Sequence, residues 1–122
     1  MTEAGPTQRW AAYRGLVCDL DGVVYRGRGA VPGVPEALEA WCTAGGRIVY
    51  ATNNASRPPQ TVAEHLVGLG APATVDQVLT SAQVGAGYLA RTLPAGAVVL
   101  AVGGPGVPAA LAEVGLQPVA EA

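Results

Sequence analysis

Short apolar runs recur along this chain, separated by segments with helical periodicity. Residues 16–20, 48–51 and 98–102 are mostly apolar, and Val78-Leu79 is a shorter run of the same kind. Runs of this length are typical of strands that are buried in a parallel sheet. We therefore predict strands at these positions, the first ending in carboxylates.

The segment after Pro32 has the pattern of an amphipathic helix. Its apolar residues fall at positions i, i+3, i+4, i+7 and i+8, which share one helical face: Val34, Ala37, Leu38, Trp41 and Cys42. Pro35 suits the first turn, and Gly45 suits the C-terminal stop. Residues 21–32, rich in Gly and Arg, are expected to form a loop or small hairpin before this helix.

Three later segments repeat the helical pattern. One starts near Pro59 and stops before Gly70, one follows Ser81 as a predicted N-cap, and one follows the turn at residues 103–106. Their apolar faces are Val62, Leu66 and Leu69; Val84, Tyr88 and Leu89; and Val107, Leu111 and Val114. Strands that alternate with helices in this way predict an α/β fold with a parallel sheet.

Composition narrows the function. Half of the residues are hydrophobic and 13% are charged, which favours a packed core over a disordered chain. The net charge is −2 and all seven basic residues are scattered arginines, so no nucleic-acid footprint is present. We expect no membrane contact, since no apolar run could cross a bilayer and residues 1–13 lack a signal-peptide core. Cys18 and Cys42 lie in apolar stretches, as buried reduced thiols do, and we expect a cytoplasmic protein.

Asp19-Leu20-Asp21-Gly22 closes the first predicted strand, at the edge where open α/β sheets bind ligands. Two carboxylates at about 4 Å repel each other by roughly 4 kcal/mol at an effective dielectric near 20. Mg²⁺ would offset this repulsion, because it binds through one or two carboxylates plus substrate phosphate. One carboxylate can then attack phosphorus while the other transfers protons. Gly22 permits a turn with positive φ and offers its N–H to phosphate. The alternative is an acidic cap at a strand end.

Thr52-Asn53-Asn54 follows the second predicted strand. A hydroxyl and two amides near the start of a helix are suited to holding phosphate oxygens. The alternative is an ordinary Asx turn before the prolines at 58 and 59.

Taken together, the two loops resemble the haloacid dehalogenase superfamily, which has an Asp-x-Asp-Gly motif after the first strand and a Thr or Ser after the second. The match extends to the NagD-like, p-nitrophenyl phosphatase-like branch (class IIA). Five segments carry it, at residues 18–27, 31–33, 51–56, 79–82 and 102–106. The resemblance covers the chain from about Leu16 onward.

The resemblance implies a Mg²⁺-dependent phosphatase that acts on a small phosphorylated metabolite through an aspartyl-phosphate intermediate. Asp19 would be the nucleophile and a metal ligand, and Asp21 the general acid/base with its carbonyl on Mg²⁺. Thr52, Asn53 and Asn54 would hold the phosphoryl oxygens. Similar proteins act on glycerol phosphate, sugar phosphates, nucleotides or pyridoxal phosphate. Residues 21–32 would form the squiggle and flap that gate the site.

The resemblance also implies a Rossmann-like three-layer α/β/α core with an inserted α/β cap. A composition shift near residues 94–96 places the core at 1–94 and the start of the cap at 95–122. The family's later Lys and acidic motif have no counterpart, since the chain has no Lys and no Asp after Asp76, and Arg91 is a poor substitute. We expect the sequence to stop inside the cap and the isolated chain to have little activity. We also expect the chain to aggregate or to self-associate, through an unpaired sheet edge and an uncovered apolar face.

The alternative function is a non-catalytic α/β binding module, or a remnant of such an enzyme. Several other residues have plain structural interpretations. We expect a solvated or half-buried position for His65, a turn at residues 103–106, and solvated roles for Arg26 and Arg28.

Overall fold

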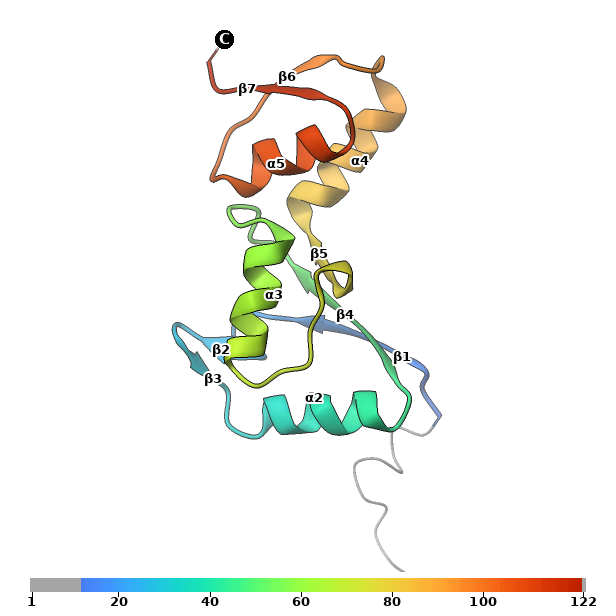
Figure 1. Cartoon of the computed structure of the whole chain (residues 1–122), viewed down its shortest axis with the longest axis vertical. Helices are drawn as coiled ribbons and strands as arrows, with labels where there is room; N and C mark the ends of the chain where they lie inside the picture. The colour runs from blue at the N-terminus through green and yellow to red at the C-terminus, as the bar shows by residue number, and fades with distance from the viewer. Residues whose placement is uncertain (1–11, 122) are drawn as a thin grey trace, which may run out of the picture.

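The computed structural model describes residues 12–121 (Figure 1). Residues 1–11 and 122 lie outside this description, and so does most of the segment at residues 1–13, which the sequence predicts to lack a signal-peptide core. Strands β1 (Gly15–Asp19), β4 (Arg47–Thr52) and β5 (Val78–Thr80) form a parallel sheet in the order β1-β4-β5. The predicted α/β class with a parallel sheet is therefore confirmed.

Two α-helices, a short 3₁₀ helix and a hairpin complete the part of the chain that contains this sheet, residues 12–80, here called the sheet unit. The elements are the hairpin β2 (Tyr25–Arg26) and β3 (Gly29–Ala30), α2 (Val34–Thr43), α3 (Pro59–Gly68) and the short 3₁₀ helix η1 (Val75–Gln77). The hairpin and both α-helices occur where the sequence pattern predicts them. Gly45 has φ +92° just after α2, which explains why that helix stops there.

The core of the sheet unit lies on one face of the sheet. Cys18, Ile48, Tyr50 and Val78 alternate with exposed residues along their strands, and all are buried against the apolar faces of α2 and α3. From the helices, the buried residues include Leu38, Trp41, Val62 and Leu66. The Trp41 indole N–H also donates to the Arg47 carbonyl at 3.0 Å, which ties the end of α2 to the start of β4.

Residues 81–121, here called the second unit, pack around a separate cluster. The elements are α4 (Ser81–Thr92), β6 (Val98–Leu100), α5 (Gly106–Glu113) and β7 (Gln117–Val119). Buried residues of this cluster are Ala86, Ala110, Leu111 and Leu116. α4 therefore packs with the elements that follow it, whereas the composition shift predicts a boundary after it, at residues 94/95. That boundary stays a prediction.

One local prediction is wrong, and one strand was not predicted. Thr80, not Ser81, is the N-cap of α4: its hydroxyl accepts from Gln83 N at 3.1 Å, and the Gln83 side chain accepts from Thr80 N at 2.8 Å. The strand β7 was not predicted at all. It contains Pro118 and is defined only by parallel pairing with β6, so its own residues carry little strand signal.

Candidate active site

Asp19 is the last residue of β1, and its side chain is exposed. Strand alternation places it on the same face as Val17, away from the buried Cys18. One carboxylate oxygen accepts from the backbone N–H of Leu20 at 2.9 Å, which orients the carboxylate at the strand end. Leu20 itself is fully buried and anchors the turn that follows.

The turn after β1 is tight. The Leu20 carbonyl accepts from Val23 N at 3.0 Å and from Val24 N at 2.8 Å, and the chain returns into the β2–β3 hairpin. Gly22 has φ +81°, as the sequence predicts. Its N–H donates to the Tyr25 carbonyl at 2.8 Å, so the donor that the sequence analysis assigned to phosphate is engaged within the turn. Asp21 is exposed beside it.

The 52–57 loop is held by its own side chains. Thr52 is buried, and its hydroxyl oxygen accepts from Asn54 N at 3.1 Å. The Asn54 side-chain oxygen accepts from Ser56 N at 3.0 Å and from the Ser56 hydroxyl at 2.6 Å. This is the Asx turn that the sequence analysis gave as the alternative. Asn54 therefore shapes the loop, and Asn53 is exposed beside it.

The parallel register brings the two loops to one edge. Asp19 pairs with Ala51, the residue before Thr52, so the nucleophile candidate and the hydroxyl lie at adjacent strand ends. Together they line an open hollow, the strand-end hollow, whose polar residues are Asp19, Thr52, Asn53, Thr80 and Ser81. Its apolar residues are Val17, Ala51, Leu79 and Val84. Asp21, Gly22 and Asn54 do not belong to this lining.

Thr80 and Ser81 also border the site, although the sequence motifs do not mark them as site residues. Thr80 pairs with Thr52 in the parallel register, and the Ser81 hydroxyl donates to the Asn53 carbonyl at 3.1 Å. The signal was available in the sequence, because hydroxyl residues directly after a short predicted strand fall at the same sheet edge as the other loops.

Tyr25, Arg57 and His65 form a small cluster beside the hairpin. The Tyr25 and His65 rings lie 4.7 Å apart at 46°, and one Arg57 guanidinium nitrogen donates to the Tyr25 hydroxyl at 3.5 Å. His65 is half-buried, as predicted. The contacts join the hairpin to α3 and to the end of the 52–57 loop.

The Cys18 thiol lies directly before Asp19, so its charge bears on the site. Burial, and secondly the neighbouring Asp19 charge, raises the pKa of the Cys18 thiol, which donates to the Asp19 carbonyl at 3.3 Å. Cys18 is thus a neutral thiol.

Within residues 12–121 no cluster of three or more His, Cys, Asp or Glu side chains could hold a metal. Asp19 and Asp21 nevertheless fit Mg²⁺, which uses one or two carboxylates and takes its other ligands from water and phosphate.

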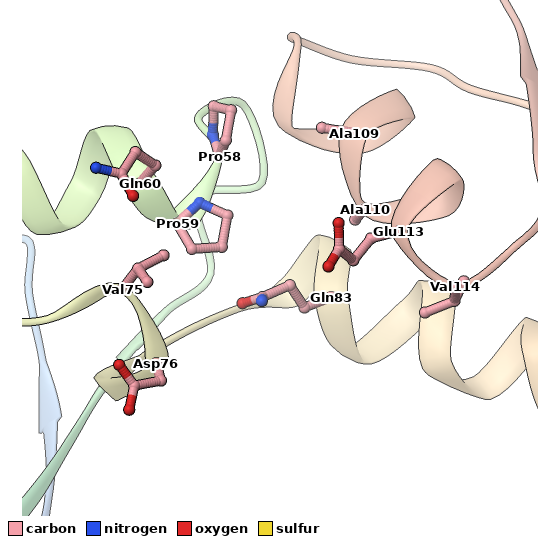
Figure 2. Close-up of a pocket in the computed structure, with 10 residues that line it drawn as sticks. All are labelled: Pro58, Pro59, Gln60, Val75, Asp76, Gln83, Ala109, Ala110, Glu113 and Val114. Carbon is pink, nitrogen blue, oxygen red and sulfur yellow. The ribbon is translucent and has the colours of Figure 1, made fainter.

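A second cleft, of about 560 Å³, lies apart from these residues (Figure 2). Pro58, Pro59 and Val75 stand on its sheet-unit side, and Ala110 and Glu113 of α5 stand opposite. None of the residues that line it belongs to the strand-end hollow. The cleft shows that the two units are not packed together along this side.

Comparison with known proteins identifies the family. Residues 16–117 match the haloacid dehalogenase-like hydrolases. The chain therefore belongs to the haloacid dehalogenase-like hydrolase family, in agreement with the resemblance read from its motifs.

Within the described residues, no helix combines the length and the apolar character needed to span a membrane.

Its relatives include phosphatases. The chain is 42% identical over 102 residues to the glycerol-3-phosphate phosphatase of Gallus gallus, covering 83% of this chain and 33% of that protein. It is 44% identical over 104 residues to the D-glycerol 3-phosphate phosphatase of Mycobacterium tuberculosis, covering 85% of this chain and 29% of that protein. The chain spans about a third of the length of these curated relatives.

A solved structure supports the same assignment. The crystal structure of glycerol phosphate phosphatase from Mycobacterium tuberculosis in complex with magnesium matches this fold with a TM-score of 0.80 and 42% identity. The match covers 89% of this chain and 32% of that chain.

Proposed function

We propose that this chain provides the nucleophile half of a phosphatase site for small phosphate monoesters, with an aspartyl-phosphate formed on Asp19. The observation that carries the proposal is the strand-end hollow, which Asp19 and Thr52 both line at adjacent carboxyl ends of the sheet. Ligands of open parallel sheets bind at this edge.

The residues act in two steps. An Asp19 oxygen attacks phosphorus, the bond from phosphorus to the ester oxygen breaks, and Asp21 gives its proton to the departing alkoxide. Water then attacks phosphorus, Asp21 takes the proton from that water, and the bond to Asp19 breaks to release phosphate. Thr52 and Asn53 hold the phosphoryl oxygens throughout. We assign Gly22 the turn that aims Asp21 and, because its N–H is engaged, no phosphate contact. Asn54 shapes the loop through its Asx turn.

Mg²⁺ bound by Asp19 and the Asp21 carbonyl would neutralise charge on the phosphoryl group. The exposed carboxylates and their oxygen chemistry support this assignment. The relatives named for glycerol 3-phosphate favour a small polyol phosphate as substrate.

The surroundings of the site complete the proposal. The second unit would begin the cap over the site, and the protein would work in the cytoplasm, where Cys18 and Cys42 stay reduced; both are free thiols. We propose no nucleic-acid partner, on the weak net charge of −2. Self-association follows from the exposed sheet face and is tested below.

Beryllofluoride with Mg²⁺ tests the site directly, because it mimics a phosphoryl group on a carboxylate. We expect it to shift the amide NMR signals of residues 19–22 and 52–54 in the wild-type chain. Asp19→Asn should abolish these shifts. Asp76→Asn, at an exposed carboxylate of the second cleft, is the matched control and should leave them unchanged.

The result also separates the two function classes. Shifts that persist in Asp19→Asn would remove Asp19 as the nucleophile. No shifts in the wild-type chain would favour a non-catalytic α/β binding module, because the loops would then hold no phosphoryl mimic.

A further inference from the structure

The turn at residues 103–106 contacts the 52–57 loop, although the two are far apart in the sequence. The Gly106 N–H donates to the Ser56 carbonyl at 2.8 Å. Gly106 is buried and is the first residue of α5. The first N–H groups of a helix have no partner inside it, so the 52–57 loop supplies an acceptor that the helix start requires.

The approach is close enough to require glycine. A Cβ at Gly104 would lie 2.7 Å from Ser56 Cβ and 2.8 Å from the Ser56 carbonyl oxygen. A Cβ at Gly106 would lie 2.8 Å from the Arg57 carbonyl group and would also overlap the Ala55 carbonyl oxygen. These neighbours are mainly backbone atoms, which cannot rotate away, so any side chain here pushes the two segments apart.

The contact leads back to the candidate site through hydrogen bonds already described. Ser56 is held by the Asn54 side chain, and Asn54 N is held by the Thr52 hydroxyl. From α4, the Ser81 hydroxyl reaches the Asn53 carbonyl. The second unit thus donates hydrogen bonds to two carbonyls of the loop, those of Asn53 and Ser56.

The two units have separate cores, and β5 runs directly into α4 at Thr80 and Ser81. Their buried clusters share no residue, and the cleft of Figure 2 separates α5 from Pro58, Pro59 and Val75. In Figure 1 the second unit stands beyond the carboxyl ends of β4 and β5. The glycine turn is therefore placed to set the position of the second unit and of the loop together.

We propose that Gly104 and Gly106 are positioning residues, which hold the 52–57 loop in the conformation that presents Thr52 and Asn53 to the strand-end hollow. The proposal rests on the proposed function for the meaning of that conformation. Both glycines lie in the segment at residues 103–106, for which the sequence alone predicts a simple turn.

Gly106→Ala tests it, with Gly85→Ala as the matched control. Gly85 lies inside α4, is exposed, and has nothing within 4 Å of an added Cβ. Alanine favours helix over glycine at both sites, so helix propensity cannot explain a loss. We expect Gly106→Ala to shift the amide signals of Asn53, Asn54 and Ser56, and to weaken beryllofluoride binding about tenfold. Gly85→Ala should do neither.

The outcomes are distinct. Unchanged signals at residues 53–56 in Gly106→Ala would overturn the proposal, even with the proposed function intact. If the wild-type chain fails to bind beryllofluoride, the proposed function is wrong. The amide signals of residues 53–56 in Gly106→Ala would still test whether Gly106 positions the loop. If Gly106→Ala does not fold, Gly104→Ala and hydrogen exchange of the wild-type Gly106 amide decide it. Slow exchange is expected, and exchange at the rate of an unprotected amide would refute the contact.

Discussion

The two faces of the parallel sheet differ in what covers them. On one face Ile48 is 3% exposed and Tyr50 is fully buried under α2 and α3. On the other face Val17 is 76% exposed, Val49 39% and Leu79 43%, although all three are apolar. We call these the packed face and the bare face. The bare face is unusual, because parallel sheets are ordinarily covered on both sides.

The bare face also bears on the candidate site. Asp19 lies at its rim, and Val17 and Leu79 line the strand-end hollow together with Asp19. Whatever covers these apolar residues would also close the hollow to water, which strengthens every electrostatic interaction inside it. A group that packs over Val17 and Leu79 would therefore also lie over Asp19.

The largest difference in lost stability is expected between two neighbouring residues of β4, Ile48 and Val49. Ile48→Ala removes buried apolar contacts and should lower the free energy of unfolding by about 2–5 kcal/mol. Val49→Ala, one residue on and facing the bare side, should cost less than about 1 kcal/mol. Urea unfolding of both variants checks this. Equal losses would mean that the bare face is covered in solution.

Tyr50 should show the next effect. Its hydroxyl donates to the Pro72 carbonyl at 2.7 Å, and Tyr50→Phe should cost about 1–2 kcal/mol at neutral pH. Burial raises the pKa of Tyr50 above its ordinary value of about 10. The stabilisation is therefore complete below about pH 10 and is lost as pH rises further.

The Tyr50 effect can be isolated by measuring unfolding at several pH values from 7 to 11. The difference in stability between wild type and Tyr50→Phe should shrink above about pH 10. A difference that grows with pH would contradict the buried, neutral phenol.

A smaller effect separates the two residues at the start of α4. Thr80→Ala removes a buried capping hydroxyl and should cost about 1 kcal/mol. Ser81→Ala, its exposed neighbour, should cost less, because the hydrogen bond from its hydroxyl to the Asn53 carbonyl is exposed to solvent. Thermal unfolding of the two variants distinguishes the two residues. A larger loss of stability in Ser81→Ala than in Thr80→Ala would support Ser81 as the N-cap, as the sequence pattern predicts.

The bare face should influence association more than stability. We expect the wild-type chain to self-associate in sedimentation experiments, and Val17→Ser to reduce this with a change in unfolding free energy below about 0.5 kcal/mol. Arg47→Ser, on the same face but polar already, is a control that should leave association in place. A wild-type chain that sediments as a single monomer would refute the expectation.

Much of the fold was predictable because local patterns agreed with it. The helical periodicity of α2 predicts that helix, and the apolar runs of β1 and β4 predict those strands. None of the three predictions needs information about distant residues. The Asp19 and Thr52 loops were also predictable as neighbours, because parallel strands place their carboxyl ends at one edge. The strand β7 was missed because a three-residue strand containing Pro118 exists only through its pairing with β6.

The sequence by itself determined the α/β alternation, the family and the identity of the candidate nucleophile, since each depends on residue types and spacing along the chain. Tertiary structure alone decided which face of the sheet is packed, that the Gly22 N–H is engaged with Tyr25, and that Gly106 meets Ser56. The physical reason is common to all three. Each depends on atoms brought together by chain packing or by turn geometry, and periodicity along one segment carries no information about such partners.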